Sequence, residues 1–451
     1  MGLDILKALQ EASIEPAKPV CTGRVTRVLG VALEAQGLKL SLGDYCKIKI
    51  NASRSVEAEV VGFDGPSIKL MPLSSIEGIE PNARVMPILS HRALAVGEGL
   101  LGRVVNALGH PIDGKGTLED IERWPWEGEP INPLDRAPIE KPIDVGIHSI
   151  NAFNTLGRGQ RVGLLAGSGV GKSVLLGMMT RFTQADVVVV GLIGERGREV
   201  AEFIRHSLGE AGMKKAVVVA APADESPMMR LKAAETTHRI AEWFRDKGKH
   251  TLLLMDSLTR YGQAQREIAL ATGEMPASKG YPSSVFSKLP KLVERSGNGP
   301  EGGGSITAIY TVLAEGDDLQ DPIVDASRAI LDGHIVLSRK LAERGHYPAV
   351  DIERSVSRVM PQVVDMKTLS YAHKMKSWLS RYAENEDLVA MGAYQPGRDI
   401  ELDRAMAAYP QIMNFTSQAM HEAGGLKQSL LLAKNLVNEI ELSNEPDPAQ
   451  E

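Results

Sequence analysis

The side chains best suited to chemistry lie between Ala166 and Ser173, in the run Ala-Gly-Ser-Gly-Val-Gly-Lys-Ser. The apolar run Val162–Leu165 precedes it and a helical pattern follows, which is the strand, loop and helix order of a phosphate-binding loop. Its glycines let successive backbone N–H groups surround an anion, and the helix start adds positive charge. Lys172 would reach the outer phosphates, and the Ser173 hydroxyl would hold Mg²⁺. A chance glycine turn before an ordinary helix is the alternative.

The loop departs from the usual pattern at one position, because Ala166 stands where the first glycine is expected. Alanine fits if this residue still belongs to the preceding strand, so we expect the strand to reach Ala166. We predict that the nucleotide is bound by the following loop and helix residues: Gly167, Ser168, Gly169, Val170, Gly171, Lys172, Ser173 and Val174.

Carboxylates follow two other apolar runs. Asp256 comes directly after Leu252–Met255, and beside a phosphate loop such an aspartate holds Mg²⁺ through water. Glu195 lies in the run Gly-Glu-Arg-Gly-Arg-Glu, after a strand pattern, where open α/β sheets bind ligands. Glu195 is the candidate base for an attacking water, while Glu199 could support the water shell of the metal and Arg196 could contact phosphate. The alternative is a solvated charge run at a helix start.

Apolar runs without alternation predict the sheet that positions these groups. They occupy residues 162–165, 187–190, 217–221, 252–255 and 306–313. Strands that are apolar on both faces are typical of buried parallel sheets, and helical patterns such as Arg230–Arg245 separate the runs. We therefore predict an α/β fold with a P-loop parallel-sheet core, an N-terminal small β-barrel and a C-terminal α-helical domain.

Two segments precede this core. Residues 1–19 contain an amphipathic stripe over Leu3–Ile14, which is too short to be a stable helix alone. It either packs on its own domain or orders on a partner as a docking helix. Residues 20–90 alternate with period two between glycines, as in Cys46–Ile50 and Val56–Val60, and this spacing of short strands predicts a closed β-barrel domain.

The core is predicted over residues 91–364, and a C-terminal helical domain over residues 365–451. No strand pattern occurs after about Val364, whereas Met366–Leu388 and Leu426–Glu441 have helical patterns. The chain then ends in an acidic tail that we expect to be frayed.

Composition narrows the classes of function. The 451 residues are 43% apolar and 24% charged, as in soluble globular proteins. A net charge of -6 and the presence of only Tyr45 and Phe63 as aromatics in residues 20–90 disfavour nucleic-acid binding. Cys21 and Cys46 make no disulfide framework, which favours reduced thiols in the cytoplasm. No apolar run approaches the ~18 residues of a membrane span and no signal peptide is apparent, so we expect contact with a membrane only by recruitment.

Further motifs follow the loop in order along nearly the whole chain: Asp256-Ser-Leu-Thr-Arg260, His346-Tyr-Pro-Ala-Val350 and Ser355-Val-Ser-Arg-Val359. With the loop and the Glu195 run, they resemble the rotary ATPase family, the catalytic relatives of F-type and V-type subunits. Within that family the chain is most similar to the type III export ATPases, and to the flagellar branch more than the virulence branch. This closer resemblance rests on Lys279-Gly-Tyr-Pro, Leu331-Asp-Gly-His-Ile-Val-Leu-Ser-Arg339 and Gly392-Ala-Tyr-Gln-Pro-Gly.

The resemblance implies catalytic roles for Lys172, Glu195, Arg196, Arg260 and Arg358. Arg196 and Arg260 match arginines beside the phosphates, and Arg358 matches the arginine that is supplied across a subunit boundary. Tyr347 matches the aromatic residue that stacks on adenine. Without the resemblance, Tyr347 would be interpreted as a core tyrosine beside a proline turn.

Assembly and partners are also implied. F-type rings divide the base and the trans arginine between two kinds of subunit, whereas Glu195 and Arg358 occur here in one chain. Identical copies could then build six complete sites, each from two neighbours, so we expect a homohexamer. The resemblance further implies that Leu3–Ile14 binds a stator-like flagellar export regulator and that Gly273–Tyr281 faces a central stalk-like coiled coil in the ring pore. The export gate and chaperone–cargo complexes are the other expected partners, at the cytoplasmic side of the inner-membrane export apparatus.

The predicted function is hydrolysis of ATP, with Mg²⁺ as cofactor, to energise or prime type III export of flagellar proteins. The virulence secretion ATPase is the nearest alternative. An RNA translocase of the Rho type shares a barrel and a P-loop ring, but the low aromatic content of residues 20–90 disfavours it. A non-catalytic nucleotide-binding ring subunit is disfavoured by Glu195.

Overall fold

The computed structural model describes residues 21–88, 93–126, 128, 130–314, 318 and 320–443. The predicted docking helix within residues 1–19 lies outside this part of the chain, as does the acidic tail. The chain divides into two compact units after residue 90.

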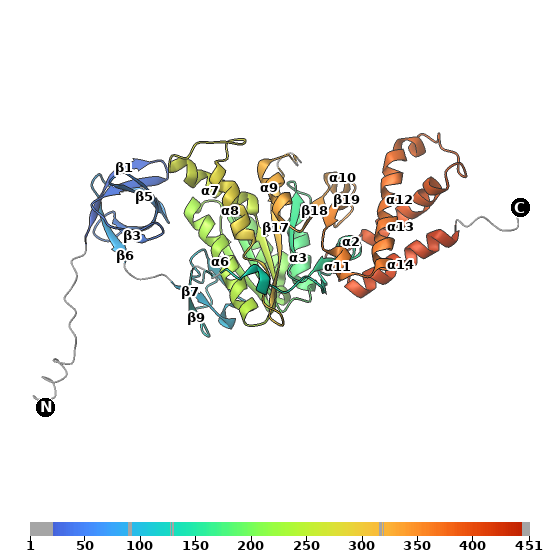
Figure 1. Cartoon of the computed structure of the whole chain (residues 1–451), viewed down its shortest axis with the longest axis horizontal. Helices are drawn as coiled ribbons and strands as arrows, with labels where there is room; N and C mark the ends of the chain where they lie inside the picture. Colours follow the sequence, from blue (N-terminus) through green and yellow to red (C-terminus); the bar gives the residue numbers. More distant parts are fainter. Residues whose placement is uncertain are drawn as a thin grey trace, which may run out of the picture. The chain divides into compact units, whose positions relative to one another are not determined.

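The first unit is a closed antiparallel β-barrel with the strand order β1-β2-β5-β4-β3-β6, coloured blue in Figure 1. In β3, and in β4 as far as Val60, every second residue is buried, because alternate side chains point into the barrel. The predicted strands Cys46–Ile50 and Val56–Val60 correspond to β3 and β4. The strand bounds are Gly23–Leu29 (β1), Ala32–Gln36 (β2), Tyr45–Lys49 (β3), Ser55–Asp64 (β4), Ser67–Pro72 (β5) and Arg84–Ile88 (β6).

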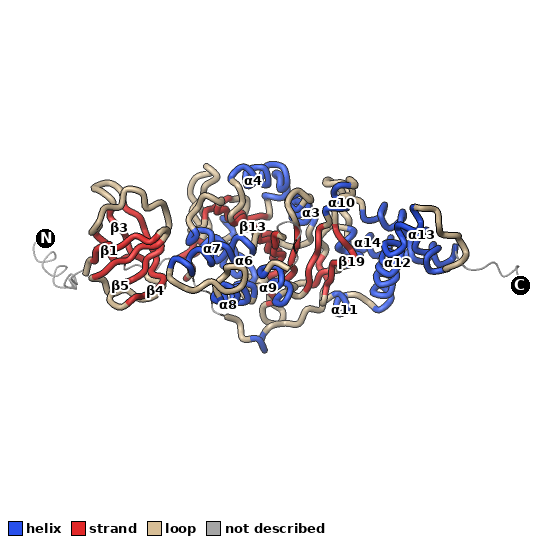
Figure 2. The backbone as a smooth tube through the Cα atoms, turned by 90° about the horizontal axis from the view of Figure 1, so that it is seen from above, coloured by secondary structure: helices blue, strands red, loops and turns tan. Residues whose placement is uncertain are grey.

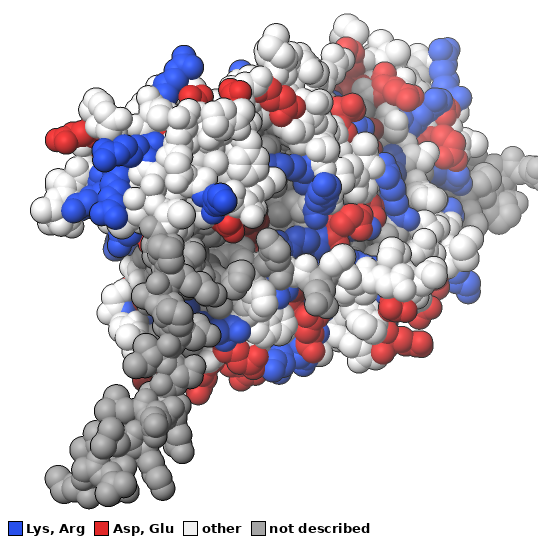
Figure 3. All heavy atoms as spheres, turned by 60° about the vertical axis from the view of Figure 1, so that its left-hand side comes forward, with Lys and Arg blue, Asp and Glu red and all other residues white. Residues whose placement is uncertain are grey.

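The two faces of the barrel wall differ in polarity. Cys46 points inward, and burial raises the pKa of its thiol to about 12. Outside, Arg24 and Arg84 are exposed and lie opposite each other on β1 and β6. Figure 3 brings the barrel side of the molecule forward and shows both basic and acidic side chains on the visible face. Cys21 and Cys46 are both free thiols, so neither forms a disulfide in the described residues.

The second unit is built on a nine-stranded sheet with the order β19-β18-β12-β17-β15-β13-β14-β8, and β16 pairs with β17 outside this path. Neighbours along the path are parallel except β18 and β19. The predicted buried runs are confirmed as strands β12, β13, β14, β15 and β17. The bounds are Val104–Asn106 (β8), Arg161–Ala166 (β12), Val187–Ile193 (β13), Ala216–Ala221 (β14), His250–Asp256 (β15), Gly297–Asn298 (β16), Ser305–Leu313 (β17), Gly333–Leu337 (β18) and Val350–Ser357 (β19).

Helices cover both faces of this sheet. Val188 and Val190 of β13 share one core with residues of α3 and α4. Gly191 faces α6, where an added Cβ would stand 2.6 Å from the Thr237 hydroxyl oxygen, so glycine permits the close approach of this helix. Figure 2 shows α4 on one side of the sheet and α8 and α9 on the other. The bounds are Lys172–Phe182 (α3), Gly197–Glu202 (α4), Gly209–Met213 (α5), Pro227–Asp246 (α6), Leu258–Ala271 (α7), Ser283–Val293 (α8), Pro322–Ile330 (α9), Arg339–Glu343 (α10) and Met360–Val363 (α11).

The chain ends in three helices, α12 (Met366–Ala390), α13 (Ile400–Thr416) and α14 (Leu426–Ser443). The predicted helices are confirmed as α12 and α14, and α13 is an addition to the prediction. The three helices share a core with β19 and with α2 (His148–Phe153). In the described part of the chain no helix combines the length and the apolar character that a membrane span needs.

The segment between barrel and core, rich in glycine and proline, forms two small antiparallel pairs. β7 (Ala93–Val96) pairs with β9 (Glu122–Pro125), and β10 (Pro142–Ile143) pairs with β11 (Leu156–Gly157). The turn at Asp113 is held by Arg103, whose guanidinium donates to both carboxylate oxygens at 2.8 and 3.0 Å. These bonds hold the pKa of Asp113 well below its usual range.

Candidate active site

The phosphate loop leaves the sheet where the sequence predicts. Ala166 is the last residue of β12 and pairs with Leu313 of β17, which confirms that the residue departing from the glycine pattern belongs to the strand. α3 begins at Lys172, directly after the loop. Gly169 and Gly171 have φ angles of 78° and 88°, which other residues rarely adopt. The loop conformation therefore depends on glycine at these two positions.

Lys172 brings two acidic side chains together. Its ammonium lies 2.6 Å from Asp256 Oδ1 and 3.4 Å from Glu195 Oε1. Asp256 ends β15, and Glu195 follows the end of β13, the parallel neighbour of β15. The two carboxylates therefore meet beside the loop at the carboxyl edge, the edge of the sheet where β12, β13 and β15 end. The side chains of Lys172, Glu195 and Asp256 are only 12%, 13% and 4% exposed.

Burial and charge compete in this cluster. Burial alone would lower the pKa of Lys172, but the charges of Asp256 and Glu195 more than offset it, so the pKa of Lys172 lies above its usual value. Burial raises the pKa of Asp256, and Lys172 opposes that rise. Burial also raises the pKa of Glu195; Lys172 opposes this too, and the neighbouring Glu199 carboxyl adds to it. Lys172 is therefore firmly cationic, and Glu195 is a stronger base than an exposed glutamate.

A threonine completes the cluster. The Thr311 hydroxyl on β17 donates to Asp256 Oδ1 at 2.5 Å and is fully buried. Thr311 was not predicted, because no motif contains it. Hydroxyl side chains within the run Ile306–Leu313, at Thr307, Tyr310 and Thr311, are the signal that could have found it, since a buried hydroxyl needs a partner.

The two other predicted site residues of the Glu195 run, Arg196 and Glu199, lie at the entrance of the site. Arg196 precedes α4 and its side chain is 84% exposed, while Glu199 is in the first turn of that helix. Their side chains are 3.8 Å apart, a surface pair that contributes little to stability. The structure thus places Glu199 beside Glu195 and Arg196, and it leaves the Arg196 guanidinium facing solvent.

Arg260 lies against the same turn. Its aliphatic stem packs over Gly194, where an added Cβ would stand 2.9 Å from Arg260 Cβ. One guanidinium nitrogen, Nη1, donates to Gln263 at 2.8 Å. Within the described residues, Arg260 Nε is buried without a hydrogen-bond partner. Because Gly194 has no side chain, Arg260 can lie against the backbone directly before Glu195.

Tyr347 also lies beside the loop. Its ring carbons are 3.3 and 3.4 Å from the position of a Cβ added at Gly171, although the two residues are far apart in the sequence. The ring is 44% exposed, so it is not the core tyrosine that the local sequence suggests by itself. An exposed aromatic face next to a phosphate loop is suited to stacking on a nucleotide base.

The donor set suits Mg²⁺ that arrives with a nucleotide. No group of three or more His, Cys, Asp or Glu side chains in the described residues could hold a metal by itself. Mg²⁺, however, keeps several waters and is commonly held by one or two side-chain oxygens together with phosphate. Ser173 is exposed at the start of α3 and Asp256 lies against the adjacent Lys172. These oxygens fit that mode of binding.

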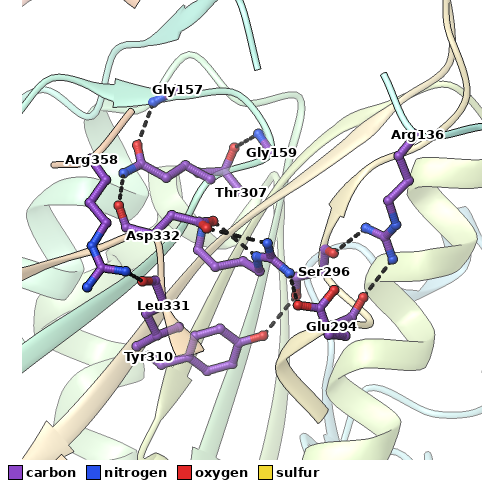
Figure 4. Close-up of polar contacts among 12 residues, drawn as sticks. Arg136, Gly157, Gly159, Glu294, Ser296, Thr307, Tyr310, Leu331, Asp332 and Arg358 are labelled. Carbon is purple, nitrogen blue, oxygen red and sulfur yellow. Dashed lines mark hydrogen bonds and ion pairs between the residues drawn. The ribbon is translucent and has the colours of Figure 1, made fainter. Parts of the chain in front are cut away.

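Arg358 lies at the opposite edge of the sheet. β19 runs antiparallel to β18, and Ser357 pairs with Gly333 at the start of β18. Arg358 is therefore at the amino edge, where β12 and β18 begin, about 16 Å from the carboxyl edge at about 3.3 Å per residue of β12. Its guanidinium donates to the carbonyls of Arg328 and Leu331, both at 3.2 Å. Figure 4 shows the bond to Leu331. The structure brings the other predicted catalytic residues to the carboxyl edge and separates Arg358 from them.

Comparison with known proteins follows the same division of the chain. Residues 25–88 match the ATP synthase alpha/beta family, beta-barrel domain; residues 146–357 match its nucleotide-binding domain; and residues 364–432 match the T3SS EscN ATPase C-terminal domain. The assembled ATPase EscN of the enteropathogenic E. coli type III secretion system has a similar structure, with a TM-score of 0.87, 41% identity, and coverage of 92% of this chain and 100% of that chain.

Two curated relatives are more similar in sequence. The flagellum-specific ATP synthase of Pseudomonas aeruginosa is 59% identical over 94% of this chain and 95% of its own length. That of Salmonella typhimurium is 55% identical over 90% of this chain and 92% of its own length. The chain therefore belongs to the ATP synthase alpha/beta family and, within it, to the flagellum-specific ATP synthases.

Proposed function

We propose that this ATPase of flagellar protein export hydrolyses ATP at the carboxyl edge, with Glu195 orienting the attacking water and accepting its proton. The observation that supports this best is that the carboxylates of Glu195 and Asp256, which come from separate segments, both contact the ammonium group of Lys172. Transfer of the γ-phosphoryl group to water needs a cation on the phosphates, an acid that supports the metal and a group that positions the water. Hydrolysis at this site energises or primes export.

Lys172 exchanges partners when ATP binds. In the structure its counter-ions are Asp256 and Glu195, and incoming phosphates compete with both for the ammonium. Thr311 keeps Asp256 in place during this exchange because its hydroxyl bond does not involve the lysine. Ser173 and, through water, Asp256 would hold a Mg²⁺ ion, which neutralises charge that develops on the phosphate oxygens.

The same exchange prepares Glu195 to act as a base. A general base works best when its pKa is raised toward the working pH while the group is still ionised. Burial raises the pKa of Glu195, and Lys172 is the principal opposing influence. When the phosphates draw Lys172 away, this opposition weakens and Glu195 becomes more basic while ATP is in the site.

Arg358 is proposed to complete the site of a neighbouring copy. It lies at the amino edge, whereas the loop of its own chain lies at the carboxyl edge. An exposed arginine on this edge can reach a second copy more readily than its own nucleotide. Six identical copies in a closed ring would then form six sites, which is the assembly we propose for this chain.

The proposed partners follow from the same architecture. The EscN ATPase has been solved in complex with its central stalk EscO; that structure has a TM-score of 0.83 and 40% identity to this chain, and covers 92% of it and 100% of the EscN chain. We propose that the loop Gly273–Tyr281, between α7 and α8, contacts a corresponding stalk in the ring pore; Met275 of this loop is 80% exposed. The N-terminal segment would bind the export regulator, with the export gate and chaperone–cargo complexes as further partners. Recruitment by them would place the enzyme at the cytoplasmic side of the inner membrane.

Replacing Glu195 with Gln tests the mechanism. The change keeps the shape of the side chain and removes the negative acceptor, so hydrolysis should fall by at least ~10²-fold while a fluorescent ATP analogue still binds. Glu202→Gln is the matched control, because Glu202 ends α4, the helix that follows Glu195, and pairs with Arg198 at the surface. Near-normal turnover of the Glu195 variant would remove Glu195 from the mechanism.

A further inference from the structure

A group of polar residues surrounds Arg358 at the amino edge (Figure 4). We call it the amino-edge clasp and define it as Gln160, Arg161, Asp332, Ser357 and Arg358. Gln160 and Arg161 lie at the start of β12, Asp332 precedes β18, and Ser357 ends β19. Three strands of the sheet therefore meet here through polar contacts.

The strongest contact in the clasp joins Arg161 to Asp332. The guanidinium donates from Nε to Asp332 Oδ2 at 3.0 Å and from Nη2 to Oδ1 at 3.4 Å. The backbone adds two bonds, from Arg161 N–H to Asp332 Oδ2 at 3.0 Å and from Asp332 N–H to the Arg161 carbonyl at 2.8 Å. The side chains are only 20% and 25% exposed, so solvent screens this forked pair weakly. By contrast, Glu294, the second partner of Arg161, is 61% exposed.

The Asp332 side chain does not contact the guanidinium of Arg358. Asp332 lies next to Leu331, whose carbonyl group accepts a hydrogen bond from that guanidinium. The carbonyl of Asp332 accepts from the Arg358 N–H at 3.0 Å, and the adjacent Leu331 carbonyl accepts from Arg358 Nη1. The Asp332 carboxylate fixes this turn to Arg161. A change at the carboxylate would therefore move both the backbone anchor and the side-chain anchor of Arg358.

Gln160 closes the clasp from the other side. It is fully buried, and its amide Nε2 donates to the Asp332 carbonyl at 3.2 Å and to Ser357 Oγ at 3.0 Å. Gly333 allows the strands to meet, since a Cβ there would stand 2.4 Å from the Val356 carbonyl oxygen. The turn before β18 and the end of β19 are thus held on both sides of Arg358.

We propose that Asp332 is a positioning residue for Arg358 and that it acts on the nucleotide of the neighbouring copy rather than on its own. This inference rests on the proposed trans role of Arg358. A group that must meet developing charge on phosphate loses much of its effect when it is displaced by about 1 Å, at a cost of up to ~10²-fold in rate. Asp332→Asn should therefore lower kcat by roughly tenfold or more and change KM for ATP little.

Mixed assemblies separate this role from support of the chain's own site. Asp332→Asn chains keep an intact Glu195, and Glu195→Gln chains keep an intact clasp and Arg358. In an equal random mixture about one interface in four would join an intact base to an intact arginine. We expect the mixture to exceed the mean rate of the two separate variants severalfold. If Asp332 supported only the phosphate loop of its own chain, through β12, the rate of the mixture would equal the mean rate of the two separate variants.

Two controls keep the outcomes distinct. A mixture of Arg358→Ala and Glu195→Gln tests the trans arginine itself; failure to regain activity there contradicts the proposed function, whatever Asp332 does. If the Arg358→Ala mixture exceeds the mean rate of its separate variants and the Asp332→Asn mixture does not, the role proposed for Asp332 is wrong. Full activity of the Asp332→Asn variant alone would overturn it as well.

Arg161→Lys keeps the positive charge but loses the two-point contact with the Asp332 carboxylate. It is mixed with Glu195→Gln in the same way, in case Asp332→Asn assembles poorly. Asp325→Asn, at an exposed aspartate of α9, should leave turnover unchanged.

Discussion

The two edges of the central sheet hold their candidate catalytic groups in opposite ways. At the carboxyl edge, Lys172, Glu195 and Asp256 are largely buried and compensate one another. At the amino edge, Arg358 is exposed and is held by backbone carbonyls, with no carboxylate as its direct hydrogen-bond partner among the described residues. A buried cluster is costly to disturb, whereas an arginine on carbonyls can exchange them for phosphate oxygens at little cost.

In the proposed shared site, this difference would divide the work between the two edges. The carboxyl edge carries the groups that must be in fixed positions before ATP arrives, since burial holds their geometry. The amino edge carries a charge without a counter-ion, which remains available for an anion presented by another molecule. Variants at the two edges should therefore differ in whether stability is lost together with activity.

The largest effect is expected for Lys172→Ala. Turnover should fall by at least ~10³-fold, because the cation on the outer phosphates is lost. The variant should also unfold more easily, by about 3 kcal/mol, since Asp256 would be left buried without its ion-pair partner. Adding Asp256→Asn should restore the midpoint of thermal unfolding without restoring hydrolysis. Unchanged stability of the single variant would mean that the buried pair is not a stabilising contact.

Arg358→Ala should lose nearly as much activity with almost no loss of stability. An arginine supplied to a phosphoryl-transfer site is worth ~10³-fold or more in rate. Its bonds to carbonyls at the end of α9 contribute less than about 1 kcal/mol at an exposed position. Thermal unfolding and steady-state hydrolysis, measured on the same preparation, check both parts. A large loss of stability would show that this arginine is structural.

Tyr347 should affect binding more than turnover. Loss of an aromatic stacking partner costs about 1–3 kcal/mol per base, so Tyr347→Ala should raise KM for ATP by roughly tenfold. Tyr347→Phe retains the ring beside Gly171 and should behave as the wild type. A titration with a fluorescent nucleotide distinguishes the two variants. Equal losses in both would assign the effect to the hydroxyl group instead of the ring.

The smallest effect is expected in the pH profile. Glu195 must be ionised to accept a proton, and its pKa is raised, so kcat should fall as the pH decreases through that raised pKa. The Glu199 carboxyl contributes to the rise. Glu199→Gln should therefore move the acidic limb of the profile to lower pH. Glu202→Gln, on the same helix, should leave the limb in place, and a shift toward higher pH in Glu199→Gln would contradict the assigned coupling.

The sequence predicted the carboxyl edge well, because motifs with fixed spacing mark strand ends. Lys172, Glu195 and Asp256 each follow a recognisable apolar run, and parallel strands must bring such ends together. The position of Thr311 depends on the neighbouring strand, which no local pattern reports. The amino-edge clasp was missed for the same reason: Arg161 and Asp332 are ordinary residues until the crossover places the start of β12 beside that of β18.

The secondary structure shows the same limit. Continuous apolar runs located the central strands, and helical patterns located the long helices, since these elements bury whole faces. α13 was not predicted, and its interior Pro410 weakens the helical pattern. Tyr347 was recognised only through the family resemblance, because its contact with Gly171 links distant segments.

With the trans role proposed for Arg358, having the phosphate loop and Arg358 on opposite edges also restricts how copies can associate productively. A two-fold dimer joins the same surface patch of both copies, so it cannot fill both sites when donor and acceptor lie at opposite ends. Head-to-tail association completes one site at each junction, and an open chain of copies always leaves the phosphate-loop site at one end without an Arg358. Only a closed ring completes every site. Specific activity should therefore rise with protein concentration and reach a plateau once closed assemblies predominate, even if every copy folds and binds ATP when alone.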